Sequence, residues 1–209
     1  EVRIVAHAES GRSFISKGFL KEARKAAQKN ITIFKDLIDE EHPLVGIEPS
    51  AILGFRDEYL RLAKDDEEAK ALAKHTFTIE EFLCAEIKAE RIKAASFTTE
   101  AKKLKIHGHC HQKSLSGIEH TFAILNLPVN YTPTIIPSGC CGMAGSFGYE
   151  KEHYVLSMQI GEQTLFPAVR KASEDTLIAA PGTSCRHQIK DGTQRQAQHP
   201  VTILKNALV

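Results

Sequence analysis

Ser138-Gly139-Cys140-Cys141-Gly142-Met143-Ala144-Gly145 places two adjacent cysteines between glycines. Glycine accepts positive φ at no steric cost, so the chain is expected to turn sharply here and to present both sulfurs on one loop. Two further cysteines lie in stretches of similar composition, His107-Gly108-His109-Cys110-His111-Gln112-Lys113 and Pro181-Gly182-Thr183-Ser184-Cys185-Arg186-His187. Four of the five cysteines therefore lie in predicted loops rich in glycine, proline and histidine.

Each of these loops follows an apolar segment typical of a buried strand, at residues 104–106, at 134–136 after an extended stretch at 127–131, and at 176–180. Amphipathic patterns between them predict helices over about 114–125 and 151–172. The alternation of strand and helix predicts an α/β fold, with a mainly parallel sheet and flanking helices. Because the carboxyl ends of parallel strands share one edge of a sheet, the three cysteine loops are expected to converge.

The first half of the chain shows a similar alternation. A strand is expected at 2–6, a long helix over about 16–39, a strand at 43–47 and a helix over about 51–62. Residues 65–95 predict two helices broken near 75–78, the second of which carries Cys84 as a small half-buried side chain.

The two halves share an order of elements that indicates an internal repeat. Glu9-Ser10-Gly11, a long helix, a strand and Pro49-Ser50-Ala51 correspond to Cys140-Cys141-Gly142, a long helix, a strand and Thr183-Ser184-Cys185. We therefore expect a partial, degenerate repeat at 1–64, a helical connector at 65–101 and a complete repeat at 102–209. The missing amino-terminal part of the first copy predicts that the chain is a fragment of a longer protein.

Composition excludes several classes of function. The 209 residues contain 27 Lys and Arg against 26 Asp and Glu, so nucleic acid is not the expected partner. No apolar run approaches the roughly 18 to 20 residues of a transmembrane segment, and no secretion signal is evident, so a cytoplasmic protein is expected. Five cysteines near histidines in such a protein favour metal or redox chemistry over disulfides.

Cys110, Cys140-Cys141-Gly142 and Cys185 resemble the cysteine-rich CCG domain of the heterodisulfide reductase family. The same domain occurs in iron-sulfur subunits of glycolate oxidase, anaerobic glycerol-3-phosphate dehydrogenase and lactate-utilisation systems, and in FAD-linked oxidases. The stretches at 107–113 and 182–188 resemble the FAD-linked oxidases most, and Ser10-Gly11-Arg12 and Glu48-Pro49-Ser50 resemble the first CCG copy of that group. The resemblance implies two related CCG-type lobes, the first truncated.

The resemblance implies an electron-transfer module of a flavin-dependent oxidoreductase for 2-hydroxy acids of the glycolate or D-lactate type. Electrons would pass from a flavin through ferredoxin-type iron-sulfur domains or subunits of the same complex, and FAD would belong to the parent protein only. The complex would be cytoplasmic or peripheral at the inner membrane. This chain has no run of Cys-x-x-Cys motifs, no Gly-x-Gly-x-x-Gly and no phosphate-binding loop, so it is not expected to oxidise a hydroxy acid alone.

The cysteines also predict a metal site from ligand chemistry alone, because thiolate suits iron-sulfur clusters and zinc while imidazole suits zinc and iron. The candidate ligands are Cys110, Cys140, Cys141, Cys185, His109, His111 and His187. Adjacent side chains diverge, so a single zinc ion would take one of the vicinal pair with Cys110, Cys185 and a histidine, whereas a cluster could use both. The related domains in some cases end in Cys-x-x-Cys, where this chain has Gln188.

Several alternatives remain open at this point. The thiols could form a disulfide or be purely structural, and the metal could only staple a docking module that has no redox role. Strand alternation sends neighbouring side chains to opposite sides, so His107, His109 and His111 cannot all be ligands. Arg12 and Glu48 are candidates for a pocket contributed by the first repeat, whereas Arg56 and Asp57 are more typical of a solvated helix end.

Overall fold

The computed structural model describes residues 1–209, which form two units, Glu1–Gly46 with Ser50–Phe77, and Ile47–Pro49 with Thr78–Val209. The first unit is mostly helical. Its elements are α1 (Arg12–Ser16), α2 (Leu20–Phe34), β1 (Leu44–Gly46), α3 (Pro49–Ile52), η1 (Leu53–Arg56), α4 (Glu58–Leu62), α5 (Asp66–Lys74) and the paired strand β2 (Thr76–Thr78).

The core of the first unit forms along the apolar face of α2, as the spacing of its residues predicts. Ala23, Ala27 and Ile31 are at most 1% exposed and face inward with Leu53 and Tyr59. The expected helix over 16–39 is shorter, because α2 runs only from Leu20 to Phe34, and Gly18, with a φ of 77°, separates it from α1, which ends at Ser16.

The expected strand at 2–6 is wrong. Val2 and Ile4 are 90% and 95% exposed, and the segment has no partner strand. The backbone of Ala8 and Glu9 is hydrogen-bonded to the side chain of Asn30 and not to a neighbouring strand. Asn30 accepts a hydrogen bond from the Ala8 N–H and donates one to the Glu9 carbonyl, each at 2.9 Å.

The second unit is an α/β domain, and the predicted fold class is confirmed here. Its four strands lie in the order β4-β3-β5-β6, and every neighbouring pair is parallel. In chain order the elements are α6 (Ile79–Lys88), η2 (Ala94–Ser96), β3 (Lys102–Ile106), α7 (Cys110–Leu115), α8 (Glu119–Leu125), β4 (Tyr131–Ile135), η3 (Phe147–Tyr149), η4 (Lys151–His153), α9 (Tyr154–Glu162), α10 (Leu165–Arg170), β5 (Leu177–Ala179), α11 (Thr183–Thr193), β6 (Ala197–Gln198) and α12 (Pro200–Asn206).

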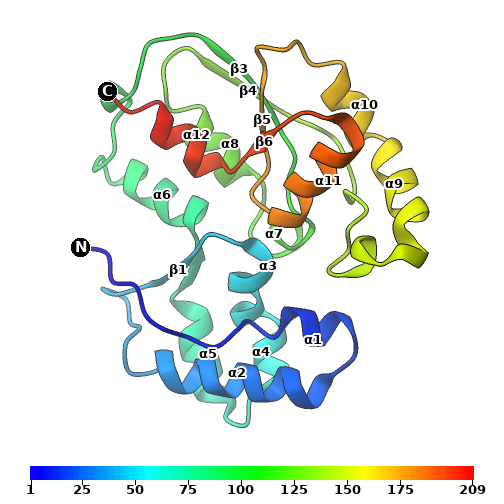
Figure 1. Cartoon of the computed structure of the whole chain (residues 1–209). Helices are drawn as coiled ribbons and strands as arrows, with labels where there is room; N and C mark the ends of the chain where they lie inside the picture. The colour runs from blue at the N-terminus through cyan, green and yellow to red at the C-terminus, as the bar shows by residue number, and fades with distance from the viewer. The chain divides into compact units, whose positions relative to one another are not determined.

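Helices cover both faces of this sheet, with α6, α8 and α12 on one side and α9, α10 and α11 on the other (Figure 1). Alternate residues of a strand point to opposite faces. Ala179 accordingly packs with Leu104 and Ile106 on the first side, whereas Ile178 packs with the α10 side chains Leu165 and Phe166 on the second.

Two local features depart from a regular sheet and helix. The expected helix over 151–172 is divided into η4, α9 and α10. Pro167 accounts for the break between α9 and α10, because it lacks an N–H and its ring would clash with the carbonyl four residues earlier in a continuous helix. Pro133 lies within the edge strand β4, opposite Leu104. No helix of the structure has the length and apolar composition needed to cross a membrane.

Candidate functional site

The four loop cysteines follow three neighbouring strands of the second sheet. Cys110 begins α7 after β3, Cys140 and Cys141 lie in the loop after β4, and Cys185 lies in the first turn of α11 after β5. Because these strands are parallel neighbours, their carboxyl ends open at one edge of the sheet.

Three buried side chains meet at this edge. The ligand atoms of His107, Cys141 and Cys185 all lie within 4.8 Å of one another. Cys140 is half-buried and Cys110 is exposed, so the site extends from the interior to the surface. All five cysteines are free thiols, and Cys84 lies apart on α6, where its sulfur contacts the carbonyl of His120 at 3.4 Å.

The outer pair of thiols is joined by a hydrogen bond. This bond raises the pKa of Cys110, which burial raises further, and lowers the pKa of Cys140. The sulfur of Cys140 also accepts a hydrogen bond from the N–H of Gly142 at 3.2 Å. Both contacts favour the charged form of Cys140 over that of Cys110.

The inner pair shows the same division of roles. Hydrogen bonds to Cys140 and to Cys185, together with burial, raise the pKa of Cys141. The bond from Cys141 lowers the pKa of Cys185 well below its usual range, and the neighbouring His107 lowers it further against the effect of burial. The four thiols thus form one connected group, which is a set of soft donors suited to a metal ion or cluster.

His107 has the environment of a metal ligand. Its Nδ1 lies 2.7 Å from Oγ of Ser138, while its Nε2 is buried without a hydrogen bond of normal geometry. A histidine that donates from one ring nitrogen to a fixed partner leaves the other nitrogen free to bind a metal. The orphaned nitrogen beside the sulfurs of Cys141 and Cys185 therefore fits a metal in this space.

His107 was absent from the histidines predicted as ligands. The signal that could have found it is its place directly after β3, a strand with neighbours on both sides. A side chain at the carboxyl end of such a strand is enclosed by the loops of the two neighbouring strands, whereas residues two or more positions later already belong to the next helix.

The three predicted histidines have other contacts. His109 is the N-cap of α7, where its Nδ1 accepts the N–H of His111 at 3.2 Å, and burial lowers its pKa. The His111 ring stacks on that of His109, with 5.9 Å between the centroids. His187 lies with Nδ1 2.9 Å from the hydroxyl of Tyr149. None of the three is in the buried group of His107, Cys141 and Cys185.

The loop that carries the vicinal cysteines is fixed from both ends. Nζ of Lys113 on α7 donates to the carbonyls of Ser138 and Gly139 at 2.9 and 2.6 Å. Gly142 has a φ of 104°, and a Cβ at this position would lie 2.1 Å from the carbonyl oxygen of Ser157. The expected positive φ is thus confirmed for Gly142 but not for Gly139.

Gln188 follows Cys185 by three residues, and its side chain is buried. Its Nε2 donates to the carbonyl and to Oγ of Ser157, at 3.1 and 2.9 Å, which ties α11 to α9. The same nitrogen lies 2.8 Å from the Cβ that Gly142 lacks. Gln188 therefore packs between Ser157 and Gly142, beside the loop that carries the vicinal cysteines.

The two residues predicted for a pocket belong to different units. Arg12 lies in the first unit and pairs with Glu58 at 2.5 Å. Glu48 lies in the second unit, where its Oε2 accepts the N–H of Thr183 at 2.8 Å. Thr183 begins α11, and a carboxylate is favoured at the amino end of a helix.

Comparison with known proteins gives relatives among dehydrogenases. The chain is similar to a subunit of the anaerobic glycerol-3-phosphate dehydrogenase of Escherichia coli (strain K12), with 28% identity over 95% of this chain and 49% of that protein. It is 30% identical to the D-2-hydroxyglutarate dehydrogenase of Pseudomonas putida, over 97% of this chain and 19% of that protein. The lactate utilization protein A of Geobacillus sp. (strain WCH70) is 26% identical over 95% of this chain and 81% of its own length.

The chain therefore spans about half of the first relative and about a fifth of the second. No protein-family model matches it, and no solved structure gives a significant match. The predicted resemblance to components of dehydrogenases is confirmed at this level, while the narrower assignment to the CCG domain family stays a prediction.

Proposed function

We propose that this chain is an electron-transfer module of a flavin-dependent oxidoreductase for 2-hydroxy acids of the glycolate or D-lactate type. The observation that carries the proposal is the meeting of His107, Cys141 and Cys185 in one buried group. The relatives support the class of reaction, since their names refer to glycerol 3-phosphate, D-2-hydroxyglutarate and lactate, which are all hydroxylated compounds.

The site is proposed to hold an iron-sulfur cluster or a zinc ion. His107, Cys141 and Cys185 would be the inner ligands, and Cys140 and Cys110 would be the outer ones. A bound cluster supplies a one-electron donor and acceptor, whereas zinc has no redox chemistry and supplies only a link between loops. The contribution of Ser138 is to hold the His107 ring with Nε2 toward the sulfurs.

The remaining parts of the reaction belong to other domains in this proposal. FAD and ferredoxin-type clusters lie in the parent protein or in subunits of the same complex, which is cytoplasmic or peripheral at the inner membrane. The exposed thiol of Cys110 supports this arrangement, because electrons can reach a site that opens at the surface.

A second function is favoured by one specific observation. Cys141 and Cys185 belong to the hydrophobic cluster that packs α10 and α11 against the sheet. A metal bound there would fasten these helices, so the module could serve as a metal-stapled docking domain without a redox role.

The test uses the parent protein with Cys141 or Cys185 replaced by serine, and Cys84→Ser as a matched buried-thiol control. We expect the first two variants to lose metal and the electron paramagnetic resonance signal of the reduced site, and to lose electron delivery to the final acceptor. Flavin bleaching by substrate should stay fast, because the flavin lies upstream. Full turnover in both site variants would contradict the electron-transfer role, and loss of folded protein in both would favour the docking module.

A further inference from the structure

Glu80, on the first turn of α6, is a buried carboxyl group outside the thiol site. It has no exposed surface, and neither of its oxygens has a hydrogen bond of normal geometry. Burying an unpaired carboxylate is so costly that such a group usually keeps its proton. The closest basic group is His199, whose Nε2 lies 3.8 Å from Oε1 of Glu80.

His199 cannot supply a positive charge without losing a structural contact. Its Nδ1 accepts the N–H of Val201 at 3.1 Å as the N-cap of α12, so this nitrogen carries no hydrogen. Its Nε2 carries the only ring hydrogen and donates it to the carbonyl of Ile47 at 3.1 Å. Burial lowers the pKa of His199, and the charge of Arg186 lowers it further. Glu80 therefore faces a neutral imidazole.

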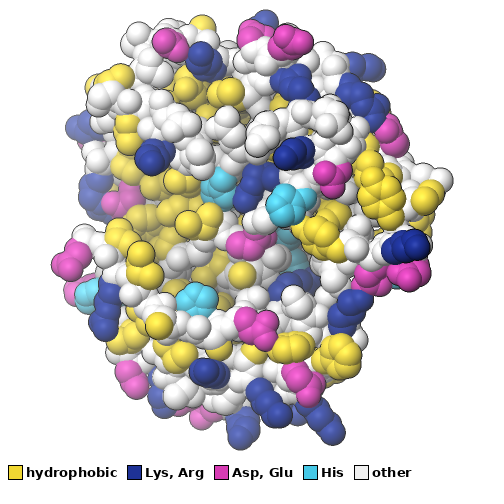
Figure 2. Space-filling model, viewed as in Figure 1, with side chains coloured by type: hydrophobic (Ala, Val, Ile, Leu, Met, Phe, Trp, Pro, Cys, Tyr) yellow, Lys and Arg dark blue, Asp and Glu magenta, His cyan; other side chains and the backbone are white.

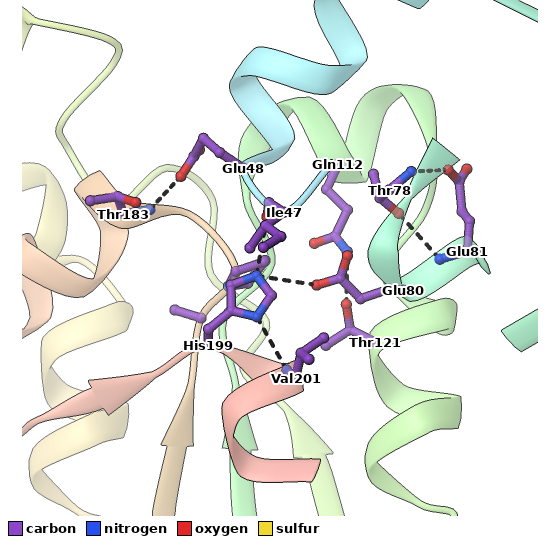
Figure 3. A network of polar contacts seen from close by, with 12 residues as sticks. Ile47, Glu48, Thr78, Glu80, Glu81, Gln112, Thr121, Thr183, His199 and Val201 are labelled. Carbon is purple, nitrogen blue, oxygen red and sulfur yellow. Dashed lines mark hydrogen bonds and ion pairs between the residues drawn. The ribbon is translucent and has the colours of Figure 1, made fainter. Parts of the chain in front are cut away.

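Gln112 on α7 presents a second unsatisfied group. Its Nε2 donates to Oγ1 of Thr121 at 2.7 Å, while its Oε1 is buried without a partner. The side chains of Glu80 and Gln112 point into the same interior region (Figure 3). Both oxygens of Glu80 and Oε1 of Gln112 are thus buried acceptors without a hydrogen bond of normal geometry, and a proton on Glu80 would supply a donor in this region.

We propose that Glu80 is a proton-binding site that carries a proton at acidic to neutral pH beside the neutral ring of His199. When this proton leaves, the charged Glu80 draws the Nε2 hydrogen of His199 away from Ile47. The imidazole stays neutral throughout, and its single hydrogen changes acceptor.

The surrounding charges agree with this assignment. Burial raises the pKa of Glu80 to about 7, against the effect of its own backbone N–H and of the Thr78 side chain, which lower it, and the negative charges of Glu81 and Glu48 raise it further. Cys84 lies one turn along α6, where burial raises the pKa of its thiol, so it adds no charge at neutral pH. The group that faces Glu80 from the start of α12 is His199, and the buried side chain of α7 is the uncharged Gln112.

The transfer of the His199 hydrogen bond from Ile47 to Glu80 has a consequence for the thiol site. Ile47 is followed by Glu48, which accepts the N–H of Thr183 at the start of α11 (Figure 3). The first turn of α11 carries Cys185. Loss of the hydrogen bond to Ile47 loosens this segment, so the proton on Glu80 governs how firmly the start of that helix is held.

The test compares the intact protein with Glu80→Gln and Glu81→Gln, followed by infrared spectroscopy and by ¹⁵N NMR of histidine between about pH 5 and about pH 9. Glutamine at position 80 keeps a neutral side chain with a donor, while glutamine at position 81 removes the adjacent charge and is compatible with a capping box. Below neutral pH we expect the carbonyl band of a neutral acid in the wild type and in Glu81→Gln, and its absence in Glu80→Gln.

The histidine spectra give the second readout. Nδ1 of His199 should stay unprotonated over the whole range, and the Nε2 hydrogen should shift with a midpoint near pH 7 in the wild type but not in Glu80→Gln. A protonated Nδ1 without an acid band would reveal an ordinary ion pair and overturn the proposal. A titrating acid band with a constant Nε2 signal would overturn the change of acceptor. If Glu80→Gln fails to fold, the wild-type signals of His199 alone distinguish a neutral pair from an ion pair.

Discussion

Nδ1 of His107 lies 2.7 Å from Oγ of Ser138, so the histidine that follows β3 is tied to the loop that follows β4. This contact joins two of the three segments that form the thiol site. It also selects which ring nitrogen faces the sulfurs, since the nitrogen that is hydrogen-bonded to Ser138 is not available to a metal.

Ser138→Ala should weaken metal binding without unfolding the protein. The His107 ring loses the partner that fixes its orientation, and removal of such a partner typically lowers metal affinity about 10- to 100-fold. Ser116→Ala is a matched control, because the Oγ of Ser116 is buried without a hydrogen bond. Competition with a zinc chelator measures both affinities, and equal values for the two variants would show that the contact does not orient the ligand.

Replacement of the individual histidines should distinguish a histidine that binds the metal from one that only stabilises the fold. His107→Ala is expected to reduce the metal bound per chain after anaerobic purification, because the buried group loses its nitrogen donor. His109→Ala should keep the metal but lower the free energy of unfolding by about 1 kcal/mol, through loss of the α7 N-cap. Metal analysis and urea unfolding of both variants check this, and metal loss only in His109→Ala would reverse the assignment.

The two glycines beside the vicinal cysteines should respond differently to alanine. Gly142→Ala is expected to cost more than about 2 kcal/mol, because it adds a left-handed penalty and a clash with the Ser157 carbonyl. Gly139→Ala has open space around its Cβ and should change stability by less than about 1 kcal/mol. Urea unfolding of the metal-free proteins measures both, and similar losses would mean that the loop adapts at Gly142.

Stability should depend on pH through Glu80. Its pKa is raised from 4.5 to about 7 in the folded protein, so the folded state holds one more proton than the unfolded state between these values. This contribution to the free energy of unfolding should be greatest below about pH 4.5, fall as pH rises through pH 7 and stay constant above it, with a total change of about 3 kcal/mol. Denaturant unfolding over this range should show a flatter profile for Glu80→Gln than for Glu81→Gln, and parallel profiles would exclude Glu80 as the cause.

The parallel α/β arrangement could be predicted from the sequence because turn-forming residues clearly mark the ends of the strands in the second unit. The apolar segments at 104–106, 134–136 and 176–180 correspond to β3, β4 and β5, and each ends in glycine, proline or histidine. Convergence of Cys141 and Cys185 follows from that topology. The internal repeat and the boundaries drawn from it remain predictions.

The mistaken strand at 2–6 has a local physical cause. Apolar residues at 2–6 fit a strand pattern, but a strand also needs a partner, which sequence periodicity does not reveal. The choice among His107, His109 and His111 depends on where β3 ends and α7 begins, within a span of four residues. Such boundaries are set by tertiary contacts, here by the Ser138 hydroxyl and by the N-cap of α7.

Pro133 limits how the sheet of the second unit can grow. It lies in β4, the edge strand, and proline in an edge strand removes a donor that an incoming strand would need. The opposite edge, β6, is only two residues long. Neither edge is a good template for strand addition, which protects the protein against edge-to-edge aggregation. Strand addition is therefore disfavoured at both edges of this sheet, and exposed apolar side chains lie around η3 and α9 instead (Figure 2).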